Sequence, residues 1–183
     1  DEKDSPAEKL LEQISIEKAN LVKSGKIKKQ KKPSHLAPED EPFSLPSGWT
    51  WCSLLEICTL ENGDRSKNYP NKSMLVETGI PFVNAGDLEN GYISEKANSF
   101  ITEERYEILN SGKFQNGDIL FCLRGSLGKS AIVNGFNKGA IASSLVIIRS
   151  FSAINEHFLQ KYFESPFAAH MISLYDNGTA QPN

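Results

Sequence analysis

The glycine-rich stretch Gly125-Ser126-Leu127-Gly128-Lys129-Ser130 contains the residue types of a loop that binds nucleotide phosphates. Such a loop needs four residues between its first glycine and the Gly-Lys-Ser triplet, which would place a glycine where Leu123 stands. The apolar residues that follow predict a strand, whereas a phosphate loop leads into the N-terminus of a helix. The sequence therefore argues against nucleotide hydrolysis.

Other residues that could carry chemistry form incomplete patterns. Ser165-Pro166-Phe167 has one proline where the base-holding motif of amino-methyltransferases has two. Asp87 and Glu89 lack the lysine of a nuclease site and offer too few ligands for a metal. The histidines share no predicted face, and the cysteines have apolar neighbours that place them in the core: His35, His157 and His170; Cys52, Cys58 and Cys122. We expect no catalytic residue, no cofactor and no metal.

Polar and basic residues gather instead in segments that follow predicted strands or turns. Arginine, asparagine, glutamine and serine hydrogen-bond to base edges, while lysine and glycine-rich backbone suit phosphates. The segments are 65–68, 84–87, 124–126 and 177–183. Ordinary surface loops have a similar composition, so these residues alone leave both DNA contact and simple solvation open.

The charge of the chain is unevenly spread. Its 183 residues contain 20 Lys and Arg and 23 Asp and Glu, a net charge of −3 that by itself argues against nucleic-acid binding. Residues 1–32 contain nine lysines, and six of these lie from Lys23 to Lys32 with no acidic residue between them. Residues 33–64 contain six acidic residues and no lysine or arginine. The lysine run is most simply a solvated linker, with phosphate contact the less favoured interpretation.

Several classes of protein are disfavoured by composition. No apolar run approaches the roughly 18 residues of a membrane helix, and the opening Asp1-Glu2-Lys3-Asp4 does not resemble a signal peptide. The odd number of cysteines, without a Cys-x-x-Cys pair, argues against a disulfide scaffold or structural zinc site. We therefore expect a protein of the cytoplasm.

The first 42 residues are predicted to form a helix and a charged, proline-containing connector. Ser5-Pro6-Ala7-Glu8 is typical of a capping box, apolar residues then recur at helical spacing, and Gly25 is placed to end the helix. The connector runs over residues 26–42, with prolines at 33, 38 and 42. A single domain is predicted over residues 43–183.

That domain mixes strands and helices. Its predicted strands are 80–84, 119–123, 130–134 and 140–149, its predicted helices are 102–110, 155–165 and 166–175, a turn is expected at 62–64 and a long loop at 65–77. Strands in the middle and helices at the end favour an α+β fold over alternating α/β units. We predict a central, mostly antiparallel, twisted β-sheet with helices grouped at the C-terminal end and an N-terminal helical arm.

An ordered set of motifs spans nearly the whole chain. It comprises Ala7-Glu8-Lys9-Leu10-Leu11-Glu12-Gln13-Ile14, Glu17-Lys18, Gly25-Lys26-Ile27-Lys28-Lys29, Pro42-Phe43-Ser44-Leu45-Pro46-Ser47-Gly48-Trp49-Thr50-Trp51, Ile80-Pro81-Phe82-Val83, Gly117-Asp118-Ile119-Leu120 with the glycine-serine loop behind it, and Gly178-Thr179-Ala180-Gln181-Pro182-Asn183. In this order the motifs resemble a target recognition domain of the specificity subunits of type I restriction–modification systems. Leu-Pro-x-Gly-Trp alone would be weakly specific.

The resemblance implies a role without catalysis. In that family a full subunit has two recognition domains separated by long helices, and methyl transfer, translocation and cleavage belong to methyltransferase and restriction subunits. The chain holds one such domain, so we expect it to be part of a longer subunit. It would read one half of a split double-stranded DNA target, while the methyltransferase flips the adenine. A protein–protein docking domain with minor DNA contact is the alternative, and an autonomous hydrolase or nuclease is disfavoured.

The resemblance does not fix which residues touch DNA, because recognition domains vary most at those points. Physical reasoning selects residues on loops after strands or turns: Arg65, Lys67, Asn84, Arg124, Ser126 and Lys129. Arg65 and Arg124 are candidates for bidentate contact with guanine, and Lys67 and Lys129 for contact with phosphate. Ser143 and Ser144 fall inside a predicted strand, where a structural role is expected.

Overall fold

The computed structural model describes residues 5–30, 41–94 and 99–174, and the chain forms two compact units. One unit comprises Asp1–Thr59 with Ser150–Asn155, and the other comprises Leu60–Arg149 with Glu156–Asn183. This division describes packing, and the predicted start of a recognition domain at Phe43 stays a prediction. Within the described residues, no helix combines the length and apolar character that crossing a membrane requires.

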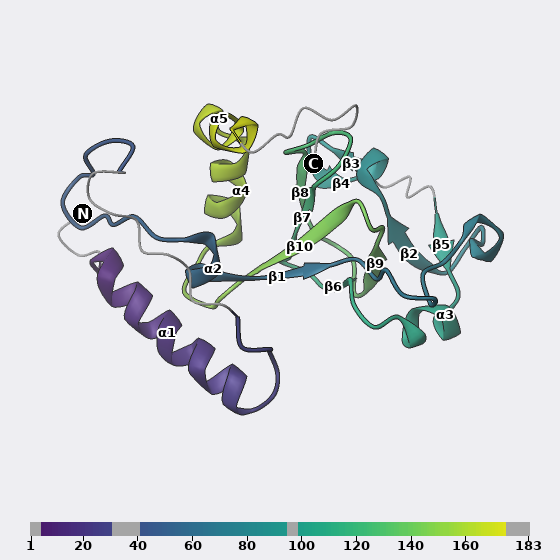
Figure 1. The fold of residues 1–183 in the computed structure, drawn as a ribbon. Helices are drawn as coiled ribbons and strands as arrows, with labels where there is room; N and C mark the ends of the chain where they lie inside the picture. The colour runs from purple at the N-terminus through teal and green to yellow at the C-terminus, as the bar shows by residue number, and fades with distance from the viewer. Residues whose placement is uncertain (1–4, 31–40, 95–98, 175–183) are drawn as a thin grey trace. The chain divides into compact units, whose positions relative to one another are not determined.

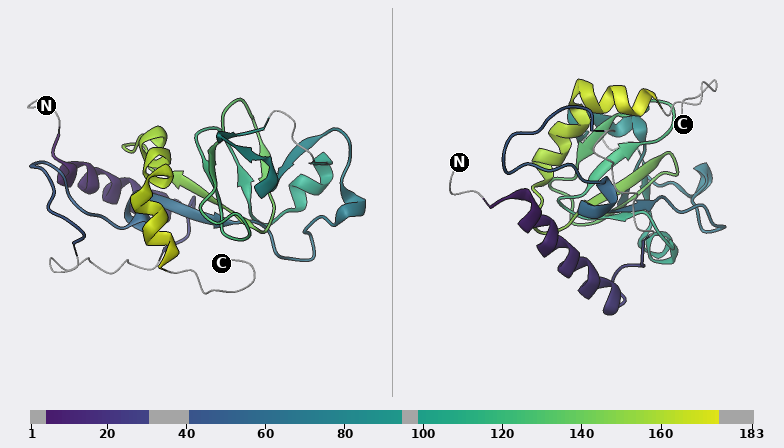
Figure 2. Two further views of the ribbon diagram at one scale, coloured as in Figure 1. Left: turned by 90° about the horizontal axis from the view of Figure 1, so that it is seen from above. Right: turned by 60° about the vertical axis from the view of Figure 1, so that its left-hand side comes forward.

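The first unit is built on the helix α1, Ala7–Lys23, which is drawn in purple in Figures 1 and 2. Ile14 is its buried residue, at 1% exposure. Lys18 donates from Nζ to the carbonyl oxygen of Leu55 at 2.6 Å, and Leu55 lies in the short helix α2, Leu54–Ile57. The Glu17 carboxylate accepts a 2.6 Å hydrogen bond from the Ser152 hydroxyl. These contacts fix the helix against residues distant in the sequence.

The beginning of α1 differs from the predicted capping box. Pro6 is the N-cap, with φ −53° and ψ 143°, and no side chain caps the helix. Because Pro6 takes the cap position, Ser5 lies one residue before the place from which a hydroxyl reaches the first turn. The backbone N–H of Ala7 instead donates to the carbonyl oxygen of Gly48 at 2.9 Å. A distant turn therefore replaces the expected local cap.

The end of α1 agrees with its prediction. Gly25 has φ +71°, its N–H donates to the carbonyl of Val22, and the N–H of Lys26 donates to the carbonyl of Leu21 at 2.9 Å. This is the pairing of a Schellman cap, in which glycine takes the left-handed position. The lysines that follow are exposed as far as the description reaches, and most of the predicted connector lies outside the described residues.

The strands belong to two mixed sheets. The larger has the order β1-β10-β7-β8-β4-β3 and the smaller β5-β2-β9-β6. The strands of the larger sheet are β1 Cys58–Asn62, β3 Leu88–Glu89, β4 Gly91–Ile93, β7 Ile119–Cys122, β8 Ser130–Ile132 and β10 Leu145–Ser150. Those of the smaller sheet are β2 Ile80–Val83, β5 Phe100–Ile101, β6 Lys113–Phe114 and β9 Gly139–Ile141. β4 pairs with β8 and β2 with β9 in parallel, while β7 pairs antiparallel with both β8 and β10.

Helices and short turns complete the second unit. They are α3 Glu103–Ile108, α4 Glu156–Glu164, α5 Pro166–Ser173, and the 3-10 turns η2 Lys72–Met74 and η3 Ala85–Asp87. Phe163 of α4 packs against Phe121 of β7, with ring centroids 5.0 Å apart. Gln160 donates from Nε2 to the carbonyl of Gly91. The predicted helix–helix corner is confirmed, because Ser165 caps α5 through the N–H of Ala168 and Pro166 occupies its first turn.

The α+β class and the helices at both ends of the chain are confirmed, but two details of the predicted sheet are wrong. The single central sheet is two sheets, and the predicted strand 140–149 is divided between them. Residues 142–144 form a turn between β9 and β10, in which the N–H of Leu145 donates to the carbonyl of Ala142 at 3.0 Å. Ser143 and Ser144 therefore lie in a turn that connects the two sheets.

Candidate nucleic-acid interface

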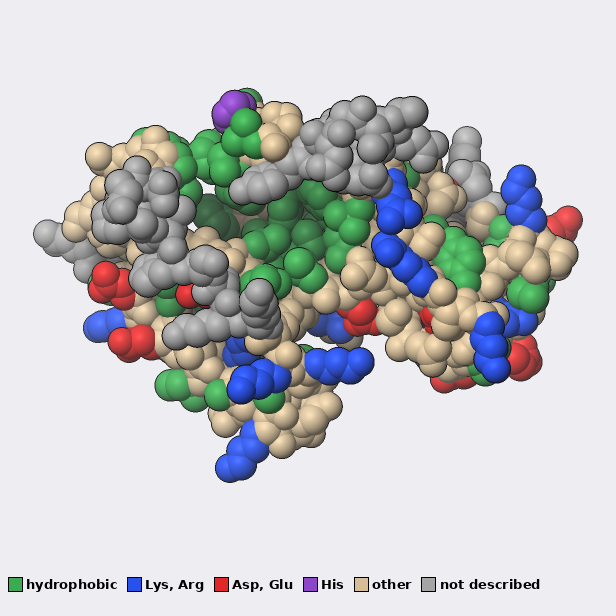
Figure 3. All heavy atoms as spheres, viewed as in Figure 1, with side chains coloured by type: hydrophobic (Ala, Val, Ile, Leu, Met, Phe, Trp, Pro, Cys, Tyr) green, Lys and Arg blue, Asp and Glu red, His purple; other side chains and the backbone are tan. Residues whose placement is uncertain are grey.

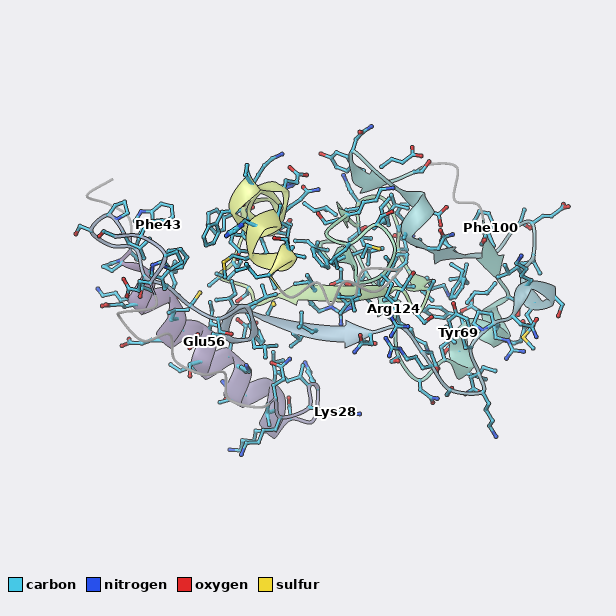
Figure 4. The ribbon with its side chains drawn as sticks, turned by 45° about the horizontal axis from the view of Figure 1, so that its top comes forward. Lys28, Phe43, Glu56, Tyr69, Phe100 and Arg124 are labelled. Carbon is cyan, nitrogen blue, oxygen red and sulfur yellow. The ribbon has the colours of Figure 1, made fainter. Side chains whose placement is uncertain are left out.

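The turn at residues 142–144 lies next to the three loops that carry the six candidate residues, 63–69, 84–87 and 123–129. The N–H of Ala142 donates to the carbonyl of Val83 at 2.8 Å, at the end of β2. The N–H of Leu123 donates to the carbonyl of Ser144 at 2.9 Å, at the end of β7. The N–H of Ser143 lies 3.5 Å from the Tyr69 hydroxyl oxygen that accepts from it. Figure 4 shows the labelled residues Arg124 and Tyr69 on two of these neighbouring loops.

The first loop, residues 63–69, is held by the buried carboxylate of Asp64. Its two oxygens accept 2.6 Å hydrogen bonds from the N–H groups of Ser66 and Asn110, and the side chain is buried. Burial favours the neutral acid, yet hydrogen bonds from the Ser66 hydroxyl and from these backbone groups hold the pKa of Asp64 below its ordinary value. The loop is thus anchored to the segment that follows α3.

Further contacts fix the same loop to its neighbours. Asn68 donates from Nδ2 to the carbonyl of Ile108 at 2.8 Å, and the ring of Tyr69 packs edge-on against Phe82 with centroids 5.7 Å apart. Arg65 and Lys67 are both exposed on this anchored loop. Other groups fix the backbone of this loop, so the Cα positions of Arg65 and Lys67 are defined without any contact from their own side chains.

Two glycines explain why the expected turn at residues 62–64 is displaced to residues 66–68. A Cβ at Gly63 would lie 2.8 Å from the carbonyl oxygen of Ala142, and one at Gly112 would lie 2.8 Å from the Cα of Gly63. The chain therefore passes through position 63 in close contact with two other backbone segments instead of turning. It turns later, where the N–H of Tyr69 donates to the carbonyl of Ser66 at 3.1 Å.

The second loop begins with Asn84, which caps η3. Its Oδ1 accepts a 2.8 Å hydrogen bond from the N–H of Gly86, and its own N–H donates to Asp87 Oδ2 at 2.8 Å. Asp87 is fully buried, so its carboxylate serves this turn. Asn84 is half-buried, and one lone pair of its amide oxygen is already used. Its side chain is consequently held in place at the edge of the sheet.

The third loop, residues 123–129, connects β7 to β8 and contains the glycine-rich stretch. The N–H of Cys122 donates to the carbonyl of Lys129 at 2.8 Å, and the N–H of Gly128 donates back to the carbonyl of Cys122 at 3.1 Å. Gly125 and Gly128 have φ values of +81° and +85°. The loop leads into strand β8, as the sequence predicted, and not into a helix. Arg124 and Ser126 are exposed on it, while Lys129 is half-buried.

All six predicted residues therefore lie on three loops of one compact unit. The turn at residues 142–144 is hydrogen-bonded to Tyr69 of the first loop, to Leu123 of the third loop, and to Val83, the residue before the second loop. Lys129 also joins two of the loops directly, because its Nζ donates to the carbonyl of Ala85 in η3 at 3.2 Å. The exposed candidates are Arg65, Lys67, Arg124 and Ser126. Contact of any of the six with DNA stays a prediction.

Sequence reasoning missed the residues at which the loops meet. Ser143 and Ser144 were assigned to the interior of a strand, and Tyr69 was assigned no role. A signal was present, since two serines stand directly before the apolar run Leu145–Ile148, and serine favours turns. The partner that fixes this turn, Tyr69, is 74 residues away from Ser143 in the chain, and no local pattern indicates it.

The cations of this unit have different surroundings. Arg149 donates from Nε and Nη2 to the two oxygens of Asp118, each at 2.7 Å, and this pairing, together with the nearby Glu61, raises the pKa of Arg149 although burial opposes the shift. Arg65 and Arg124 have no such partner among the described residues. On the face shown in Figure 3, lysine and arginine side chains are spread over the surface together with acidic and neutral ones.

The described histidines and cysteines differ in their exposure. His157 and His170 are exposed on α4 and α5, Cys58 and Cys122 are buried, and burial raises the pKa of Cys58 to about 12. Cys52 is exposed, which corrects its predicted core position. His35 lies outside the described residues. In the part of the chain that is described, no three His, Cys, Asp or Glu side chains are grouped as metal ligands.

Comparison with known proteins identifies similar chains. The specificity subunit of the type I restriction enzyme EcoAI of Escherichia coli is 32% identical over 144 residues, which cover 79% of this chain. The chain resembles part of a type I specificity subunit. The specificity subunit of EcoEI from the same organism is 50% identical over 60 residues, or 33% of this chain. The chain spans 23% of the length of the first relative and 10% of the second, and no protein-family model matches it.

Solved structures show the same fold. The HsdS subunit from Thermoanaerobacter tengcongensis matches 68% of this chain and 29% of its own, with a TM-score of 0.53 and 20% identity. A chain of a type I R-M system, from a structure concerned with complex assembly and conformational transition, matches 90% of this chain and 38% of its own, with a TM-score of 0.56 and 19% identity. The curated relatives confirm the resemblance to specificity subunits stated from the motifs, and the solved structures show that the fold is shared.

Proposed function

We propose that this chain is a target recognition domain that reads one half of a bipartite double-stranded DNA target for a type I restriction–modification complex. The similarity to the EcoAI specificity subunit over 79% of the chain is the observation that carries this proposal. The three loops that meet at residues 142–144 supply the surface. The alternative of a protein–protein docking domain is not favoured, because the similar proteins are named as specificity subunits.

The proposed reading surface combines two kinds of contact. Exposed Arg65 and Arg124 can each present two parallel donors to a guanine edge, a contact worth roughly 1–3 kcal/mol of discrimination. Lys67 is placed to neutralise a phosphate, which adds affinity without base preference. The backbone contacts of Asp64 and of the turn at 142–144 hold these side chains in register before DNA binds.

The proposal assigns no chemistry to this chain. Methyl transfer and cleavage would belong to methyltransferase and restriction subunits that bind the longer protein, and the assembly would act on DNA in the cytoplasm. The domain itself would contribute only the choice of bases. The near-neutral charge of residues 65–183 fits a module whose partners share the phosphate contacts.

A domain exchange tests the proposed function. Residues 43–174 of this chain replace the corresponding domain of a specificity subunit whose target is known, and the methylated sequence is mapped in cells. We expect one half of the target to change while the other half and the methylated base type are retained. An unchanged target in an assembled, active complex would overturn the proposal. Exchange of residues 5–30 alone is the control, for which we expect no change in target.

A further inference from the structure

We propose that Lys129 is a positioning residue that locks the glycine loop to the Asn84 turn, instead of a phosphate contact. The inference rests on the proposed function, because it concerns how the reading loops are held for DNA. The expectation of phosphate contact came from residue type alone. The geometry around Lys129 supports a different role.

Both the backbone and the side-chain tip of Lys129 form hydrogen bonds with other residues. At the backbone, its carbonyl accepts from the N–H of Cys122 at 2.8 Å, and its N–H donates to the carbonyl of Ser126 at 3.1 Å. At the tip, Nζ donates to the carbonyl of Ala85 at 3.2 Å, 44 residues away in the sequence. The residue is half-buried. Its position at the closing end of the loop makes it the direct bridge between the second and third loops.

The group that receives Lys129 is itself rigid. Ala85 opens η3, which is capped by Asn84 and by the fully buried carboxylate of Asp87. Ala85 also packs against a buried apolar cluster to which both sheets contribute. A hydrogen bond from a charged donor to a carbonyl is stronger than one between neutral groups. Lys129 is therefore attached to a fixed point.

The two glycines of the loop that Lys129 closes have open space beside them. A Cβ at Gly125 would meet nothing within 4 Å, and at Gly128 only the far end of Ile172, at 3.9 Å. Glycine has wide backbone freedom, so the orientation of the loop depends on contacts at its ends. Arg124 lies in this loop, and bidentate reading of a guanine requires a defined orientation of its guanidinium group. Release of Lys129 should thus weaken the choice of base more than it weakens attraction to DNA.

Lys67 provides a matched comparison. It is exposed and has no hydrogen-bond or ion-pair partner among the residues that the structure describes. Lys67→Met and Lys129→Met each remove one positive charge and keep the aliphatic stem. Loss of one phosphate contact reduces the magnitude of the slope of log K against log salt by about 0.9. A positioning contact leaves that slope unchanged.

The test uses the assembled complex of the full subunit and its cognate duplex. We expect Lys129→Met to reduce the ratio of cognate to non-cognate affinity by roughly tenfold, with an unchanged salt slope. We expect Lys67→Met to lower the slope by about 0.9 and to leave the ratio unchanged. Lys129→Arg, which can still donate to Ala85, should keep the ratio of the parent. A slope lowered by Lys129→Met with an unchanged ratio would overturn the inference.

Hydrogen exchange on the DNA-free protein separates this inference from the proposed function. Lys129→Met should speed exchange of the Gly128 and Lys129 amides, while Lys67→Met should not. Unchanged exchange at these amides in Lys129→Met overturns the positioning role, whatever the DNA results are. If Lys129→Met speeds exchange but the parent protein shows no base preference, the positioning role of Lys129 is supported. The proposed function is then overturned. If Lys129→Met does not fold, Lys129→Gln is measured with the same two outcomes.

Discussion

The two ends of strand β7 make opposite use of arginine. Before the strand, Asp118 is buried and receives both donors of Arg149. After it, Arg124 stands exposed on a loop with two left-handed glycines. At the first end, called the closed end below, the arginine is paired with a buried carboxylate. At the second, called the open end, the guanidinium group of Arg124 is exposed to solvent. Residue type alone therefore does not separate a structural arginine such as Arg149 from an exposed one such as Arg124, whereas the presence of a buried carboxylate partner does.

This contrast also explains what the recognisable motif does. Gly117-Asp118-Ile119-Leu120 is among the runs that carry the resemblance, and it lies at the closed end. Asp118 further accepts from the N–H of Gln115 at 2.9 Å, so its carboxylate is fully occupied. This run thus stabilises the fold, while Arg124 and Ser126, which are proposed to contact DNA, lie on the loop at the other end of β7.

The largest effect should come from breaking the closed end. Asp118→Ala removes the carboxylate that accepts from Arg149 and from the N–H of Gln115, while Arg149 keeps its 3.2 Å hydrogen bond to the carbonyl of Lys113. We expect a loss of about 3 kcal/mol in the free energy of unfolding. This is the low end for a buried pair, because the Arg149 side chain is 35% exposed and keeps some water. Denaturant unfolding measures it. Lys161→Met, which breaks an exposed pair with Glu164, is the control and should leave the free energy of unfolding close to that of the parent. Equal losses in both variants would contradict the contrast.

The open end should respond in binding and not in stability. Arg124→Ala is expected to relax base preference at one position of the target by roughly 1–3 kcal/mol, because a bidentate donor pair is lost. Its unfolding free energy should stay within about 0.5 kcal/mol of the parent, as is usual for a surface side chain. Binding to a randomised duplex library by the assembled complex measures the preference. Identical preferences in Arg124→Ala and the parent would remove Arg124 from the reading surface.

Glycine substitutions sharpen the same comparison within stability. Gly112 and Gly125 both have positive φ, at +79° and +81°, so alanine is strained at each by roughly 1–2 kcal/mol. At Gly112 the added Cβ would also lie 2.8 Å from the Cα of Gly63, whereas at Gly125 it meets nothing within 4 Å. We expect Gly112→Ala to cost about 1 kcal/mol more than Gly125→Ala in denaturant unfolding. A smaller cost for Gly112→Ala would show that the crowded backbone relaxes.

Local patterns predicted much of the fold because the decisive forces were local. The end of α1 at Gly25, the predicted helix at 102–110 and the predicted strand at 119–123 each depend on neighbouring residues. Where distant groups decide, prediction was wrong: Gly48 supplies the start of α1 and Tyr69 contacts the turn that divides residues 140–149. The six candidate residues were placed on loops correctly, but their shared attachment to that turn depends on pairings that no spacing in the sequence indicates.

The smallest effect tests the electrostatic part of the comparison. Lys67 extends from a loop anchored by Asp64, so its removal should leave both the fold and the base preference unchanged. We expect Lys67→Ala to weaken binding to all duplexes alike, and to lower the slope of log K against log salt by about 0.9, because one fewer counterion is released. Lys72, exposed at η2 in the long loop that follows, provides a control of equal charge. If Lys72→Ala lowers the slope as much as Lys67→Ala does, the positive field extends along the loop and is not confined to the three converging loops. Lowering by Lys67→Ala alone would confine the phosphate contact to the surface around residues 142–144.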